Sequence, residues 1–487
     1  MTELGATLAV VGIGVLLALP TLPALGRWGY AVLVVPVGFA GYTLIGAGLI
    51  TVGVFSSTGA LAVAGAVGAL AAFAWWLRSE SRPLLNWSEA LVAVAVVAGA
   101  AVGLAAVTDA LNATRLTPDS MWYVTIAGAL ERAGSLDPIG QAALVDRLVG
   151  ASLLHTPGVG GAGYMETWTP LLGGSGVALT AWLGRRALAV AAAPPRWAGW
   201  ILVSLLALLI TTNRVLYNLF YINSHMAVAT FLVLGVGGAW WAAVSRKWIM
   251  LLPAGLGFAV LPLFRPEGVV VVVMFLVALI VDDRWSMRHR WALVLPVVAV
   301  TLLWHGLAVP PRANLADLGI AGPVLGNLWL AAGLVALVAL TGVSRLRRLT
   351  RWVPVAMPLL LGAYVALRAF RGFSTLEESI SATATNLARD GLWGVFWWVA
   401  PVLFVVAVVV VRLPLQRAFV YPLAAWPLAL LFFAYERGGG YRVGAGDSGN
   451  RMMMHVALVL VLYLIAASGV GARLLAAEGP VSGGDEE

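Results

Sequence analysis

The sequence predicts an all-α, polytopic transmembrane protein, and two observations carry that prediction. First, 61% of the 487 residues are hydrophobic, only 11% are charged, and the mean hydropathy is +0.93. A soluble protein of that composition would have far too little polar surface. Second, apolar runs of about 20 residues recur along the chain, each long enough to cross a hydrocarbon core of roughly 30 Å as a helix. These runs do not alternate as the strands of a membrane β-barrel would.

About fifteen transmembrane helices are predicted, in this order along the chain. They fall near residues 4–25, 29–52, 56–77, 89–108, 171–190, 197–213, 225–244, 248–264, 268–281, 291–309, 323–343, 353–368, 394–411, 418–434 and 452–472. We divide the chain into N-terminal transmembrane helices (1–88), which we interpret as an extension, a transmembrane core (89–475), and an acidic, disordered cytoplasmic tail (476–487).

The charged residues orient these helices. With the N-terminus outside, one set of short loops holds most of the lysines and arginines, and the opposite set holds most of the acids. The positive-inside rule makes the first set cytoplasmic, which predicts a multi-pass protein of the cell inner (plasma) membrane. The net charge of +8 is scattered over these loops and does not form a stripe, so no nucleic acid is expected as a partner. Cysteine is absent, which excludes disulfides and thiolate chemistry.

The longest extracytoplasmic loop, residues 109–170, is predicted to hold two helices. The first, Pro118 to Gly134, places Trp122, Ile126 and Leu130 on one stripe and ends at a glycine. The second runs from Gln141 to Leu154. Both are too short and too polar to span, so we expect them to lie parallel to the membrane on its outer surface, with the apolar face down.

Asp119 stands at the start of the first surface helix. A carboxylate held just above the bilayer is suited to accept a proton from a substrate. Thr117, Pro118 and Asp119 also form a favourable helix start, with a capping threonine, a proline in the first turn and an acid facing the helix dipole. The local pattern leaves both interpretations open.

Three further extracytoplasmic loops combine arginines with hydrogen-bonding side chains at the end of a predicted span. Their residues are Asn213, Arg214, Tyr217, Asn218, Tyr221, Asn223 and His225 in the first; Arg265, Pro266, Glu267 and Gly268 in the second; and Arg437, Tyr441, Arg442, Asp447, Asn450 and Arg451 in the third. Arginines in a glycine-rich loop suit a phosphate ligand. The alternatives are interfacial anchors, a turn closed by an internal ion pair and a flexible hairpin, respectively.

With these loops, the chain resembles the GT-C superfamily of integral membrane glycosyltransferases of the actinobacterial, polyprenyl-phosphate-sugar-dependent type. Asp119, in PDSMWY, matches the carboxylate of the family's early extracytoplasmic loop. The sequence RPEG at 265–268 and GDSGNRMMMH at 446–455 look like recurring segments of such enzymes. The resemblance covers roughly residues 89–475. In the family the acidic loop usually follows the first span, whereas about three additional spans precede it here.

The resemblance implies a glycosyltransferase, of the inverting type, that moves a sugar from a polyprenyl-phosphate donor to a hydroxyl of a cell-envelope glycan, lipid or protein at the extracytoplasmic face. Asp119 would be the base, and Arg265, Arg442 and Arg451 would bind the donor phosphate. Substrate-binding roles fall to the remaining polar residues of the three loops, namely Glu267, His225, Asn218, Tyr221, Asp447 and Asn450. We expect membrane lipids as further partners, and neither a metal nor another cofactor, because arginines can neutralise a single phosphate.

Two other functions remain open. A lipid-linked polysaccharide polymerase or ligase would share the loops but use a lipid diphosphate. A lipid or solute transporter, or flippase, would share the polar groups and the prolines at 253, 262 and 266 that break helices. Transporters favour internal repeats and ionisable groups near the middle of the membrane, whereas this sequence shows no repeat and gathers its charges at one surface.

Overall fold

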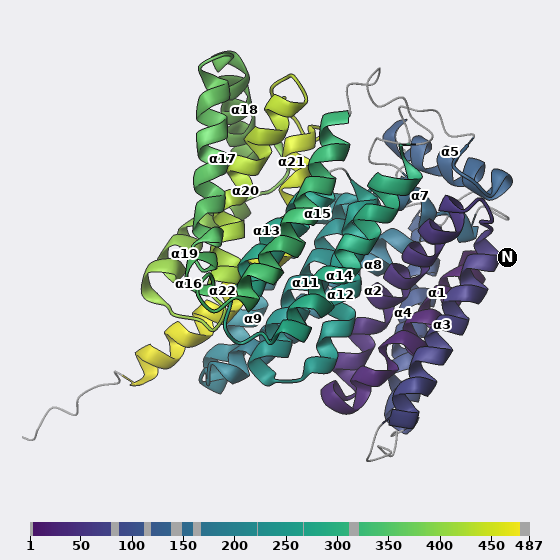
Figure 1. Ribbon diagram of the computed structural model, residues 1–487. Helices are drawn as coiled ribbons and strands as arrows, with labels where there is room; N and C mark the ends of the chain where they lie inside the picture. The colour runs from purple at the N-terminus through teal and green to yellow at the C-terminus, as the bar shows by residue number, and fades with distance from the viewer. Residues whose placement is uncertain are drawn as a thin grey trace, which may run out of the picture.

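The fold was obtained as a computed structural model, which describes residues 3–78, 87–111, 118–137, 149–158, 167–221, 223–265, 267–310 and 321–477 (Figure 1). Within these ranges every regular element is a helix and there is no β-strand, which confirms the all-helical prediction. A helix lies at the position of each predicted span, because runs of Leu, Val and Ala satisfy the backbone internally while leaving apolar faces to pack.

The N-terminal part forms a group of long helices. In chain order they are α1 (Glu3–Ala18), η1 (Leu19–Thr21), α2 (Leu22–Thr51), α3 (Ser57–Arg78) and α4 (Trp87–Leu111). α1 packs along α2 and α3, while α2 also packs on α4 and on α8 of the next group, so these N-terminal helices are joined to the rest. Less than a third of the apolar stretch of α3 or of α4 is buried, as expected for peripheral helices that face lipid.

The remaining helices surround two central ones. Their bounds are α5 (Pro118–Ala133), α7 (Val149–Leu153), η2 (Thr156–Gly158), α8 (Trp168–Val190), α9 (Pro195–Ile210), α10 (Asn213–Phe220), α11 (His225–Ser245), η3 (Trp248–Met250), α12 (Leu251–Phe264), α13 (Glu267–Ile280), α14 (Met287–Thr301), η4 (Leu302–Ala308), α15 (Ala321–Gly342), α16 (Arg347–Thr350), α17 (Val353–Ala369), α18 (Phe373–Thr385), η5 (Asn386–Asp390), α19 (Phe396–Val410), α20 (Arg417–Glu436), α21 (Ser448–Met452) and α22 (Met454–Ala477). The central pair is α11 and α22, which pack on each other and on α8. Their apolar stretches are 94% and 89% buried, so they form the core of the bundle.

Several helices can cross a membrane. Among the described residues, eight are long and apolar enough, or nine if α9 and α10, which meet at 68°, count as one broken span. Four other apolar helices, at Trp248–Phe264, Glu267–Ile280, Val353–Ala369 and Phe396–Val410, are shorter. The polytopic character is therefore confirmed. The figure of about fifteen spans stays a prediction, because these shorter helices could cross only a thin hydrocarbon layer or with help from their neighbours.

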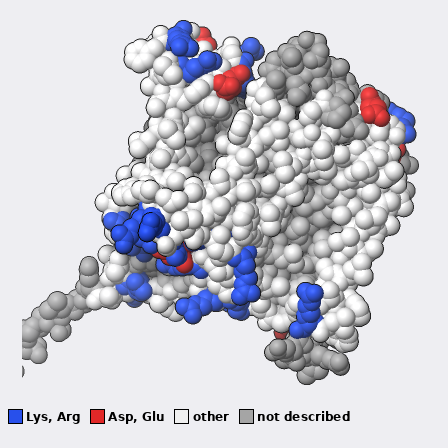
Figure 2. Space-filling view, viewed as in Figure 1, with Lys and Arg blue, Asp and Glu red and all other residues white. Residues whose placement is uncertain are grey.

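Charges separate toward the two ends of the bundle. On the face drawn in Figure 2, arginine and lysine gather at the lower end, acidic and basic residues mix at the upper end, and the band between is almost uncharged. At the lower end, Arg186 donates to the carbonyl of Leu25 at 3.4 Å, and Arg347 pairs with Asp283 at 2.8 Å. We call this the basic end. It unites loops that the charge rule assigns to one side, and the assignment of that side to the cytoplasm stays a prediction.

The opposite end, which we call the site end, carries α5, α7, α18 and α21 (Figure 1). α5 occupies the positions predicted for the first surface helix, and Gly134 ends it with a φ of +67°. Ile126 and Leu130 are buried, but Trp122 is 59% exposed, so the predicted stripe is turned: α5 packs on α7 and η2 through the face next to Trp122.

Two sequence predictions lie partly outside the described residues. Of the predicted second surface helix, Gln141 to Leu154, the structure describes only α7 and the residue that follows it. Of the predicted tail, 476–487, residues 476 and 477 still belong to α22, and the rest lies beyond the described part of the chain. α22 therefore extends a few residues past the predicted end of its span at residue 472.

Candidate functional site

The three polar loops singled out in the sequence meet at the site end. They contribute what we call the polar cluster, which consists of Arg214, His225, Arg265, Glu267, Arg451 and His455. Arg214 comes from α10, His225 begins α11, Arg265 and Glu267 flank the junction of α12 and α13, Arg451 belongs to α21, and His455 lies in the first turn of α22. The cluster thus sits at the starts of the two central helices.

Arg265 and Glu267 form a buried ion pair. Arg265 Nε donates to Glu267 Oε2 at 3.4 Å, and Arg265 Nη2 donates to Glu267 Oε1 at 3.5 Å. The two side chains are 3% and 9% exposed. Taking two charges out of water costs several kcal/mol per ion, and their attraction offsets this only in good geometry with further hydrogen bonds. The ion pair that was expected if residues 265–268 form only a closed turn is therefore present. Arg265 also contacts a second group.

That second group is a pair of histidines. Arg265 Nη1 lies 3.0 Å from Nε2 and 3.2 Å from Nδ1 of His225, and His225 Nδ1 lies 3.0 Å from His455 Nε2. Because a guanidinium can only donate, His225 accepts from it, most closely through Nε2. Its own proton then sits on Nδ1 and is donated to His455, whose proton is left on Nδ1. That nitrogen is buried and has no hydrogen-bond partner within the described ranges.

Arg214 supplies a second unused donor. It is fully buried, with Nε donating to the carbonyl of Gly391 and Nη2 donating to the carbonyl of Ala445, both at 2.8 Å. Its third nitrogen, Nη1, is buried without a hydrogen-bond partner in the described part of the chain. An acceptor oxygen placed against this nitrogen, from a ligand or from water, would therefore stabilise the site.

Positive charge exceeds negative charge at this site. The charges of Arg265, Arg451 and Arg214 all act on His225, while Glu267 and Asp447 are the acids that act on the same group of residues. Clustered guanidiniums away from water favour an anion that can accept several hydrogen bonds. The arrangement can therefore hold a phosphate.

Tyr441 anchors the third loop, which carries Arg451 of the cluster. Its ring is 3% exposed and its hydroxyl donates to the carbonyl of Leu430 at 2.7 Å. Burial raises the pKa of Tyr441, so the phenol stays neutral at physiological pH. Arg437 stacks over the same ring, with its guanidinium carbon 4.7 Å from the ring centre, and both residues tie the loop to α20.

Asp447 and Asn450, predicted to bind substrate, hold the third loop in place. Asp447 caps α21 by accepting from the backbone N–H of Asn450 at 3.1 Å, and it accepts from the N–H of Arg442 at 3.0 Å. Asn450 accepts from the indole of Trp393 at 2.6 Å and donates to the carbonyl of Gly391 at 3.4 Å. Asp447 therefore holds the loop together internally, and Asn450 fastens it to residues 391–393.

The π-helical turn η5 holds the same loop nearer its beginning, at Arg442 and Gly444. Asn386 donates to the carbonyl of Arg442 at 2.8 Å and accepts from the N–H of Gly444 at 2.7 Å. The loop is therefore bound at both flanks. The Arg442 side chain itself is exposed, so of the three arginines predicted to bind phosphate, Arg265 is buried, Arg451 is partly buried and Arg442 lies at the surface.

The other two predicted substrate-binding residues lie in and just after α10. Asn218 is fully buried, donates to the carbonyl of Arg214 at 2.8 Å and accepts from Asn223 at 3.1 Å. Tyr221 is 3% exposed, and its ring lies 4.9 Å from that of Tyr217. These side chains shape the segment that carries Arg214.

Asp119 is the second residue of α5, and its side chain lies outside the described residues. The helix that carries it is connected to the cluster through α7, because α5 packs on α7 and α7 packs on α12. The contact with α12 is close: a Cβ atom at Gly150 would lie 2.0 Å from the carbonyl oxygen of Leu263, two residues before Arg265. α7 thus joins the helix of the predicted base to the helix that ends at the buried arginine.

Three features of the candidate site were not selected by sequence reasoning. Arg214 and His455 lie within runs that the sequence singled out, but neither was selected, although an arginine between apolar segments ordinarily needs a partner. Residues 386–393 carried no signal. Their role arises from main-chain carbonyls and an asparagine whose partners are far away in sequence.

Within the described part of the chain, the polar cluster is separate from the two charged cavities at the other end of the bundle. Among the described residues, no three metal-ligating side chains gather together. Cavities of about 220 and 520 Å³ lie at the basic end, and neither includes a residue of the polar cluster. We give the cluster more weight for function, since its unused buried donors require an explanation that a surface cleft does not.

Comparisons with known proteins gave no match from which a function could be argued. No protein-family model, no curated protein and no solved structure matches the chain. The arguments about function therefore start from the chemistry of the polar cluster and from the arrangement of helices that hold it.

Proposed function

We propose that the chain is an integral membrane glycosyltransferase of the GT-C type. It would transfer a sugar from a polyprenyl-phosphate donor to a hydroxyl group of a cell-envelope glycan, lipid or protein at the extracytoplasmic face of the membrane, without a metal. One observation carries the proposal: Arg214 Nη1 and His455 Nδ1 are buried nitrogens without hydrogen-bond partners in the described residues, and the charges of Arg214 and the buried Arg265 both act on His225. A lipid phosphate supplies both the acceptor oxygens and the negative charge that such a site favours.

The reaction is a substitution at the anomeric carbon of the sugar. The acceptor oxygen forms a bond to that carbon while the bond to the phosphate oxygen breaks, and the lipid phosphate leaves with the electron pair. Arg265, Arg214 and Arg451 would stabilise the charge that develops on the phosphate. Asp119 would accept the hydroxyl proton. Glu267 would act as a positioning residue, because its ion pair fixes the guanidinium of Arg265.

The test measures transfer from a labelled polyprenyl-phosphate sugar by the full chain in lipid vesicles. Asp119→Asn should abolish transfer without loss of folded protein, while Asp137→Asn, an exposed acid shortly after the same helix, should leave it unchanged. Arg451→Ala should weaken use of the donor by more than tenfold, since a guanidinium hydrogen-bonded to an anion contributes about 1.5–3 kcal/mol. Normal transfer by the Asp119 variant would remove it as the base.

The same assay separates the alternatives. Transfer from a lipid diphosphate but not from a monophosphate would assign the site to a polymerase or ligase. Movement of the lipid between leaflets without any transfer would assign it to a flippase. Either result would overturn the proposed reaction while leaving the phosphate chemistry of the cluster intact.

A further inference from the structure

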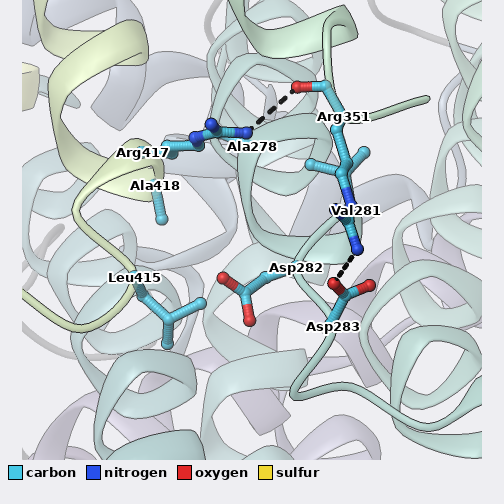
Figure 3. A pocket seen from close by; sticks show the side chains of 8 residues that line it. All are labelled: Ala278, Val281, Asp282, Asp283, Arg351, Leu415, Arg417 and Ala418. Carbon is cyan, nitrogen blue, oxygen red and sulfur yellow. Dashed lines mark hydrogen bonds and ion pairs between the residues drawn. The ribbon is translucent and has the colours of Figure 1, made fainter. Parts of the chain in front are cut away.

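A second charged site lies at the basic end, where α20 begins, and it is independent of the proposed function. Two cavities of about 220 and 520 Å³ adjoin there, since both are lined by Asp282, Leu415 and Arg417. Figure 3 shows the smaller one: Arg417 lies across it from the carboxylate of Asp282, and the side chain of Arg351 extends to the carboxylate of Asp283. The cavities lie between the loop after α13, the turn before α20 and, for the smaller one, the turn after α16.

The walls carry an excess of positive charge. Four arginines, Arg284, Arg351, Arg412 and Arg417, line the two cavities, against the two aspartates. Both aspartates are neutralised by the chain. Asp282 accepts from Arg284 at 3.1 Å, while Asp283 is bound by Arg351 and by Arg347, the latter at 2.8 Å.

Two arginines are therefore available to a ligand. Arg412 Nη1 donates to the carbonyl of Val408 at 3.1 Å, and Arg417 Nη1 donates to the carbonyl of Arg351 at 3.4 Å. Neither forms an ion pair with a carboxylate in the part of the chain that the structure describes. Each guanidinium keeps further N–H groups that can turn to an anion at the cavity, where Gln416 and Tyr421 add polar groups.

The larger cavity borders an apolar surface. Val408 and Val420 line it, and α19, which ends just before Arg412, exposes a row of valines: Val402, Val405, Val406, Val409 and Val410 are each more than half exposed. In a membrane-spanning bundle such a surface faces acyl chains. Charged donors at the end of a lipid-facing helix lie at the depth of lipid headgroups.

We propose that this site binds the phosphate of an anionic phospholipid, with the headgroup in the cavity between Arg412 and Arg417 and the acyl chains along the valines of α19. A soluble phosphate would present the same oxygens to the arginines. The lipid is favoured because its chains also cover the apolar wall, and because basic clefts between transmembrane helices suit such headgroups.

The test counts bound lipid on the purified full chain by native mass spectrometry after exchange into micelles with equal amounts of phosphatidylglycerol and phosphatidylcholine. We expect phosphatidylglycerol to be retained preferentially. Arg412→Gln combined with Arg417→Gln should weaken that retention by about 30-fold, as two basic groups near a membrane surface contribute together. Arg348→Gln serves as the matched control, because Arg348 is exposed at the same end and lines neither cavity.

Three results would overturn the proposal. Equal retention of the two lipids by the unaltered protein would do so without any variant, which guards against a double variant that fails to fold. An equal loss in the Arg348 variant would show a general effect of surface charge. Displacement of the lipid by millimolar inorganic phosphate would assign the cavity to a soluble anion instead.

Discussion

Removing the guanidinium of the buried ion pair tests the polar cluster most directly. Arg265→Gln leaves Glu267, whose side chain is only 9% exposed, as an isolated buried carboxylate, and it withdraws the donor that lies 3.0 Å from His225. Breaking a buried pair by removing one partner costs about 3–5 kcal/mol, so we expect the free energy of unfolding to fall by that amount. Denaturant titration in detergent micelles, followed by the fluorescence of the 21 tryptophans, measures it.

The partner variant shows whether the loss comes from the uncompensated charge. With Glu267→Gln added, no buried charge remains in the pair, and we expect about 2 kcal/mol to be regained. The exposed pair of Arg389 and Asp390, at 3.1 Å with side chains 78% and 34% exposed, is the control: Arg389→Gln should change the free energy by less than about 1 kcal/mol. A loss below about 1 kcal/mol for Arg265→Gln, or simple additivity in the double variant, would refute the reasoning.

Three further outcomes follow from contacts elsewhere in the molecule. Gly150→Leu should lower the free energy of unfolding by about 1–3 kcal/mol because it forces α7 away from α12, whereas Gly174→Leu, with nothing within 4 Å of its Cβ position, should change it little. Glu131→Gln should cost about 1 kcal/mol in the same titration, since its carboxylate accepts from the N–H and the hydroxyl of Ser57 at the start of α3. Burial lowers the pKa of His155 from 6.5 to about 3, so the unfolded chain binds this proton first and stability falls as the pH drops between those values. His155→Phe should remove up to about 1.4 kcal/mol per pH unit of that slope, and an unchanged slope would contradict the assignment.

Much of the fold could be predicted from the sequence. The apolar runs predicted the position of a helix at each expected span, because a membrane leaves the backbone few alternatives, and the short basic loops indicated which connections share an end. Shorter polar helices such as α18 were not predicted. Which face of α5 is buried could not be predicted. Its apolar stripe through Trp122 suggested one face, but burial of Tyr123, Ile126 and Leu130 was decided by the neighbouring α7 and η2.

The candidate site was predictable in composition but not in its connections. Arginine and asparagine at the ends of spans already marked three loops as unusual. The contact between His225 and His455, 230 residues apart, depends on how α11 and α22 pack. The hydrogen bonds from Arg214 to the carbonyls of Gly391 and Ala445 could not be predicted either, because main-chain acceptors leave no mark in the sequence.

The central position of α22 has a consequence for biogenesis. Among the described helices it is the last to leave the ribosome, yet it completes the core around α11 and delivers His455 to its partner. A nascent chain that has not yet inserted α22 would leave one side of α11 without its protein neighbour and the buried arginines without their final contacts. Packing of the core around α11 therefore waits until α22 has inserted, and chains truncated before residue 448 should be degraded faster by quality-control proteases than chains that contain α22.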